Sequence, residues 1–215
     1  METRINQNNF GKLLKSASNI KQLHLFHTNP FDKPYLSYLW SNPDDWDDGV
    51  YLRELKELHI SWTRTYTPFK DLNKLLNVSP GIMVLKLNGA KGLSSTWHPI
   101  TDELLNLEEL DLSNSDINLD NLAKFSKLAP NLKKLNLINC RNLSSGSTQD
   151  FDFENLKELY VGSDCTIEKD NLKAIIKDAK LEKAEGYKLS KLLKELAEAK
   201  QAKRAKTTAT SAAAL

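Results

Sequence analysis

One stretch of twelve residues decides how this chain folds. It reads Leu132-Lys133-Lys134-Leu135-Asn136-Leu137-Ile138-Asn139-Cys140-Arg141-Asn142-Leu143. Its first six residues place one apolar residue, two variable residues, and then apolar, variable and apolar residues. The same six-residue pattern begins at residues 20, 55, 82, 107, 132 and 156, and a degenerate copy begins at residue 181. From the second copy onward, successive copies start 24 to 27 residues apart. A fixed period of this length indicates a repeat architecture.

Each copy contains an apolar-variable-apolar core, which predicts a short strand with one face turned inward. The segment that follows the strand in each repeat is predicted to be a helix. The prediction is clearest at 119–128, where apolar residues recur at every third position before Pro130. We expect further helices at 102–105 and 171–176. One repeat cannot bury its leucine face alone, so neighbouring repeats must stack. The sequence predicts an α/β solenoid, with a parallel sheet of about seven strands on the concave side and helices on the convex side.

The segment 132–143 resembles the leucine-rich repeat family, whose pattern is L-x-x-L-x-L-x-x-N/C-x-L. It fits at every defined position, and 107–117 fits with Ser115 in place of Asn or Cys. The period and Cys140 are most similar to the longer, helix-containing repeats of the cysteine-containing subclass. The resemblance covers residues 10 to 187 and implies a horseshoe-shaped solenoid, but it leaves function open.

We expect three parts in the chain. Residues 1–187 form the repeat domain, with an insertion at about 29–51 that either packs over the first repeats or contributes to binding. Residues 188–201 form a helix that caps the last repeat, because leucines recur on one of its faces. Residues 202–215 are expected to be disordered, and their last residues resemble the remnant of a cloning vector.

Composition narrows the function classes. The chain has 30 basic and 28 acidic residues, and its slight positive charge comes from residues 180–215, so nucleic acid is a disfavoured partner. Two cysteines cannot form a disulfide framework, which favours a reducing, cytoplasmic location, or a host cytosol if the protein is a bacterial effector. No apolar run is long enough for a membrane span. We expect a monomer.

Residues for catalysis are sparse. Cys140 occupies a position of the repeat pattern whose side chain is normally buried and unreactive. Cys165 lies one residue away from the equivalent position of the next repeat, so we expect it to be a turn residue. His24 and His59 hold the same position in successive strands, with His27 nearby, and we expect no cysteine or carboxylate at matching spacing in those two strands. We therefore predict no enzyme activity, no metal, no cofactor and no small-molecule substrate.

The function that the sequence favours is protein–protein interaction, with a protein partner of unknown identity bound on the concave face. Polar and aromatic side chains beside one another are typical of interface hot spots. The alternative for Trp62, that it belongs to the core beneath the insertion, stays open. The candidate partner-binding residues are His24, Phe26, Glu57, His59, Trp62, Lys86, Asp111, Asn136 and Tyr160.

Short cytosolic-type repeats rich in Lys and Asn resemble two groups of leucine-rich repeat proteins. One group is the effectors that intracellular bacteria deliver into host cells, and the other is the substrate-receptor subunits of ubiquitin ligases. The resemblance therefore implies an effector or an adaptor. The alternative is the non-catalytic repeat region of a larger ubiquitin ligase or effector enzyme.

Overall fold

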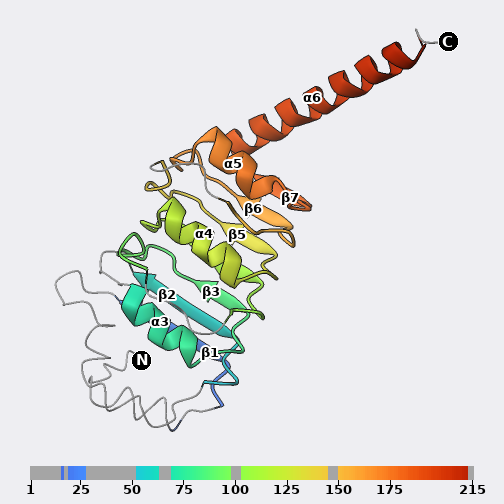
Figure 1. Cartoon of the computed structure of the whole chain (residues 1–215). Helices are drawn as coiled ribbons and strands as arrows, with labels where there is room; N and C mark the ends of the chain where they lie inside the picture. Colours follow the sequence, from blue (N-terminus) through green and yellow to red (C-terminus); the bar gives the residue numbers. More distant parts are fainter. Residues whose placement is uncertain are drawn as a thin grey trace.

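A computed structural model describes residues 16, 19–27, 52–62, 69–97, 103–144 and 150–212. The insertion at 29–51 lies outside the described residues, as do the last three residues of the tail. Seven strands form one open sheet in the order β1 to β7, and every neighbouring pair is parallel (Figure 1). The strands are β1 (Gln22–His27), β2 (Glu57–Trp62), β3 (Val84–Lys86), β4 (Glu109–Asp111), β5 (Lys134–Asn136), β6 (Glu158–Tyr160) and β7 (Lys183–Glu185). The predicted α/β fold with a seven-stranded parallel sheet is confirmed, and its stacking in sequence order is compatible with a solenoid.

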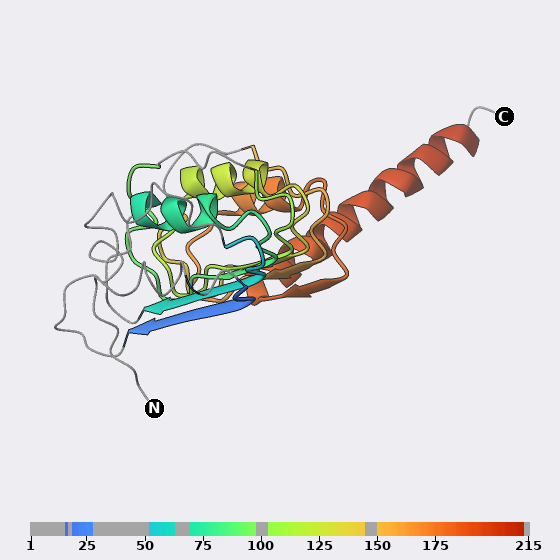
Figure 2. The same ribbon diagram turned by 90° about the horizontal axis from the view of Figure 1, so that it is seen from below.

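Three helices, α3 (Phe69–Asn77), α4 (Leu119–Leu128) and α5 (Lys169–Ile176), lie on the same side of the sheet (Figure 2). The predicted helix at 119–128 coincides with α4, whose N-cap Asn118 accepts a hydrogen bond from the backbone N–H of Asn121. The segment 171–176 lies within α5. The helix expected at 102–105 is wrong for its described residues 103–105. There the chain has no regular secondary structure before a turn at 105–106, and the Leu104 N–H donates to the Leu128 carbonyl at the end of α4.

The core lies between the sheet and these helices. The central leucine of each strand from β2 to β6 is fully buried, while the residues on either side of it in β3 to β6 are half-buried. Phe69 of α3 and Phe125 of α4 enclose Trp97, with ring centroids 4.5 and 5.4 Å from the Trp97 ring. The repeats thus share one continuous core rather than separate small ones.

The turns after the strands repeat the same backbone geometry. Gly89, Asn114 and Asn139 occupy equivalent turn positions with φ of 73°, 60° and 58°, a left-handed conformation that Gly and Asn tolerate best. The next residue is buried in each repeat, as Ala90, Ser115 and Cys140 are. Cys165 is also buried, so its assignment as a turn residue is wrong: the turn after β6 is one residue longer, which returns Cys165 to the buried column.

An asparagine ladder connects successive repeats at the turns that precede the strands. The side-chain amides of Asn106, Asn131 and Asn155 each donate to a carbonyl of the preceding repeat, those of Pro80, Leu105 and Pro130, at 3.1, 2.8 and 3.0 Å. Each asparagine directly precedes the first leucine of its repeat. This recurring Asn-Leu pair accounts for part of the high asparagine content of the chain.

The C-terminal end of the sheet is covered by α6 (Tyr187–Ala212). Leu189 and Leu192 are buried there, as the apolar stripe predicted, and the helix then extends away from the repeats (Figure 1). The prediction of a disordered tail is wrong for residues 202–212, because an Ala- and Lys-rich segment continues a helix that packing has already nucleated. None of the described helices is long and apolar enough to cross a membrane.

A single glycine sets the direction of α6. Gly186 joins β7 to α6 with a φ of +128°, and a Cβ atom there would lie 1.8 Å from the carbonyl oxygen of Val161. No other residue type fits this position without moving one of the two strands.

Candidate partner-binding face

The face of the sheet opposite α3, α4 and α5 (Figure 2) is here called the open face. The strand register places two rows of residues on it. The strand register aligns each row across all seven strands. The first row is Gln22, Glu57, Val84, Glu109, Lys134, Glu158 and Lys183, and the second row is His24, His59, Lys86, Asp111, Asn136, Tyr160 and Glu185. The structure therefore brings together seven of the nine predicted partner-binding residues.

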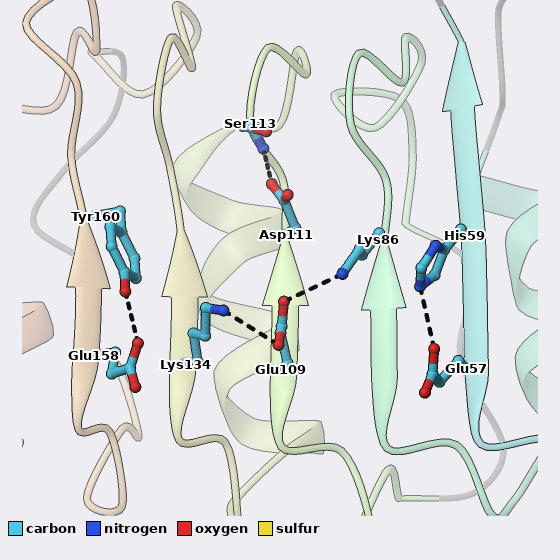
Figure 3. A network of polar contacts seen from close by, with 9 residues as sticks. All are labelled: Glu57, His59, Lys86, Glu109, Asp111, Ser113, Lys134, Glu158 and Tyr160. Carbon is cyan, nitrogen blue, oxygen red and sulfur yellow. Dashed lines mark hydrogen bonds and ion pairs between the residues drawn. The ribbon is translucent and has the colours of Figure 1, made fainter.

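In the middle of the open face, Glu109 lies between two lysines (Figure 3). Its carboxylate oxygens are 3.7 Å from Lys86 Nζ and 3.3 Å from Lys134 Nζ. The lysine side chains are about one-third exposed, at 36% and 37%, so water screens both ion pairs and each contributes little to stability. These three side chains form an ordered polar surface on which two positive charges outnumber one negative charge.

Tyr160 is the centre of a second cluster, on β6. Its hydroxyl donates to Glu158 Oε2 at 2.6 Å, while Lys134 Nζ and Lys183 Nζ lie 5.9 and 5.0 Å from the centre of its ring. Hydrogen bonds with Tyr160 and then Glu185 raise the pKa of Lys183. A half-buried aromatic ring held between two cations is the arrangement on the open face that most resembles an interface hot spot.

Asp111 and Asn136 serve the fold as well as the surface. Asp111 Oδ1 accepts the backbone N–H of Ser113 at 2.8 Å (Figure 3), and Asn136 Oδ1 accepts that of Ile138 at 3.0 Å. Each side chain thus stabilises the turn that follows its own strand. Both residues were predicted as partner contacts, and this internal role was not predicted.

The N-terminal end of the open face holds two stacked histidines. The rings of His24 and His59 are 4.1 Å apart at an interplanar angle of 10°, and His59 Nε2 is 3.7 Å from Glu57 Oε2. Burial lowers the pKa of His59, and the neighbouring His24 and Lys86 lower it further, against the opposing effect of Glu57 and Glu109. The statement that no carboxylate has matching spacing is wrong, because Glu57 and His59 are two residues apart on one strand and so share a face.

Phe26 and Trp62 differ from the other candidates. Phe26 of β1 pairs with Ser61 of β2. Trp62 is the last residue of β2 and lies two residues after Ile60, which is buried like Leu58. The side chains of both residues lie outside the described part of the chain. In the backbone alternation Trp62 therefore follows Leu58 and Ile60 and not His59, and its predicted partner contact stays a prediction.

The buried thiols lie away from the open face. Cys140 Sγ donates to the Leu112 carbonyl at 3.1 Å, and burial raises the pKa of Cys140 to about 12. Burial also raises the pKa of Cys165. Both thiols are therefore protonated at neutral pH, a state that is poorly nucleophilic.

A polar hollow at the turn end of the strands is also occupied by internal contacts. Asp116 accepts the backbone N–H groups of Gly92 and Leu93, and Arg141 pairs with Asp164.

In comparisons with known proteins, no family model matches the chain, and no curated protein is similar enough to match it.

Proposed function

We propose that this protein is a leucine-rich-repeat module that binds a protein partner on its open face, which would be the concave face of a horseshoe. The single observation that carries the proposal is the ordered polar and aromatic surface centred on Glu109 and Tyr160. Its side chains come from successive strands and are held by contacts between strands, so the surface is organised before a partner arrives. Such preorganisation reduces the entropy lost on binding.

The chemistry of this surface favours a partner segment that carries both acidic and basic groups, because the two rows hold three lysines and five carboxylates. Lys86, Lys134 and Lys183 surround Tyr160 and Glu109 and offer ammonium groups that remain partly exposed. Acidic side chains of a partner would complement them, and Tyr160 would supply the apolar contact area. This role is that of an adaptor or effector, in which the repeat surface recognises a protein.

A capture experiment tests the proposal. Tagged full-length protein would be compared with the variant Lys86→Ala/Lys134→Ala/Tyr160→Ala in capturing proteins from candidate cell lysates, with mass-spectrometric identification. The expected result is a loss of at least about tenfold in the recovered partner, since hot-spot residues each contribute more than 1 kcal/mol.

The matched control is Lys124→Ala/Lys127→Ala, which removes two exposed lysines from α4 on the other side of the sheet. Capture should survive this change. The proposal is wrong if the α4 variant loses the partner while the open-face variant, folded by circular dichroism, retains it.

A further inference from the structure

Three potential metal ligands meet at the N-terminal end of the open face. The ligand atoms of His24, Glu57 and His59 all lie within 4.8 Å of one another. His24 comes from β1, and Glu57 and His59 come from β2, so the cluster joins two adjacent strands (Figure 3 shows Glu57 and His59). Among the described residues, no other group of three such side chains comes together in this way.

His59 has an unused nitrogen that faces this cluster. Its Nε2 atom is buried and makes no hydrogen bond within the described part of the chain, and the Glu57 carboxylate oxygen at 3.7 Å is too distant for one. The side chain of His59 is only 16% exposed, so water compensates this nitrogen poorly. Buried polar atoms normally have a bonding partner, and an ion bound between His59 Nε2 and the Glu57 carboxylate would provide one.

We propose that His24, Glu57 and His59 bind one Zn²⁺ ion, which leaves one coordination position of the ion open. Two imidazoles and one carboxylate are a donor set that Zn²⁺ accepts, whereas Mg²⁺ and Ca²⁺ prefer oxygen ligands. The remaining position would take water or a donor atom from another molecule. The site is independent of the proposed partner binding, because it requires only residues of this chain.

The geometry requires a small adjustment. Two ligand atoms on a tetrahedral Zn²⁺ are about 3.3 Å apart, given zinc–ligand distances of about 2.0 to 2.1 Å. The Nε2–Oε2 distance of 3.7 Å is already close to that value. The stacked histidine rings direct their nitrogens side by side, so the exposed His24 ring would turn toward the ion while the more buried His59 stays in place.

The surrounding charges are compatible with a cation. Lys86 is the neighbouring positive group, and its ammonium lies 3.7 Å from Glu109, which partly offsets its charge. A bound ion would connect β1 to β2 and so stabilise the N-terminal end of the sheet.

The test is calorimetric titration of the full-length protein with Zn²⁺, together with thermal unfolding with and without the ion. We expect saturable binding of one ion per chain and an increase in Tm. His24→Ala and Glu57→Gln should each weaken binding by at least about tenfold and abolish the increase in Tm. Asp111→Asn is the matched control, because it removes a carboxylate from the second row, three strands from β1, and should leave Zn²⁺ affinity unchanged.

Two further measurements separate a metal site from a structural cluster. Lys86→Gln should tighten Zn²⁺ binding several-fold, because it removes a positive charge and releases Glu109. Substitution with Co²⁺ should give visible absorption typical of tetrahedral coordination in the wild type and not in His24→Ala. The proposal is overturned if no saturable binding occurs, or if Zn²⁺ binds equally well to wild type and to both ligand variants, which would place the ion elsewhere.

Discussion

The two faces of strand β4 differ in burial and in what they contribute to the stability of the fold. Leu110 points into the core and is fully buried, whereas Glu109 and Asp111, its neighbours in sequence, point to the open face and are half-buried. The covered face derives its stability from apolar area removed from water, and the open face holds its polar groups in place through weak ion pairs and turn hydrogen bonds. The fold therefore depends mainly on the covered face, and substitutions on the open face should cost less stability than substitutions in the core.

The largest effect is expected on the covered face. Leu110→Ala should lower the free energy of unfolding by about 2 to 5 kcal/mol, because it leaves a cavity in the core between β4 and the helices. Leu105→Ala is the matched control: the same change at a side chain that is 50% exposed should cost less than about 1 kcal/mol. Urea unfolding monitored by circular dichroism measures both, and equal losses would contradict the division between the faces.

An intermediate effect is expected where the open face supports a turn. Asp111→Ala should cost about 1 kcal/mol, because the backbone N–H of Ser113 loses its acceptor. Asp111→Asn keeps an oxygen at this position and should be nearly neutral in the same urea experiment. If the two variants are equally unstable, the charge of Asp111 matters and the hydrogen bond does not.

The smallest effect concerns pH at the N-terminal end of the open face. The pKa of His59 is lowered below the ordinary value of 6.5, so at pH values below 6.5 the unfolded state binds more protons than the folded state. Stability that His59 contributes above pH 6.5 is therefore lost as the pH falls from 6.5 toward its lowered value in the folded protein. His24, Lys86, Glu57 and Glu109 are the charged or titratable groups that influence it.

Thermal unfolding of metal-free protein between about pH 7.5 and about pH 5.5 measures this dependence. The Tm of the wild type should fall more across this range than that of His59→Gln, which has no imidazole to protonate. A pH dependence that is identical in the two proteins would show that His59 is no less basic in the fold than in the unfolded chain.

Much of this organisation could be predicted from the sequence. The repeated apolar-variable-apolar pattern defined seven strands and their buried leucines, because a strand that packs on one face must alternate. It also placed His24 beside His59, since equivalent positions in parallel repeats align. The position of Glu57 beside His24 and His59 was not predicted, although its place two residues before His59 on the same strand was a sufficient signal.

Other features had no signal in the sequence. The position of Tyr160 between Lys134 and Lys183 depends on side-chain conformations across three strands. The extent of α6 was underestimated, because its distal half has no apolar stripe and follows from helix propagation. Contacts of this kind depend on distances that a one-dimensional pattern does not contain.

The sequence by itself determined the repeat, the parallel sheet and the buried leucine column, because burial of apolar side chains imposes a period that can be read along the chain. Only the tertiary structure decided which polar groups meet on the open face, which turn residues are buried, and that Gly186 alone can join β7 to α6. Those outcomes depend on the approach of segments about 25 residues apart, such as Gly186 and Val161, where van der Waals contact and electrostatics select one arrangement.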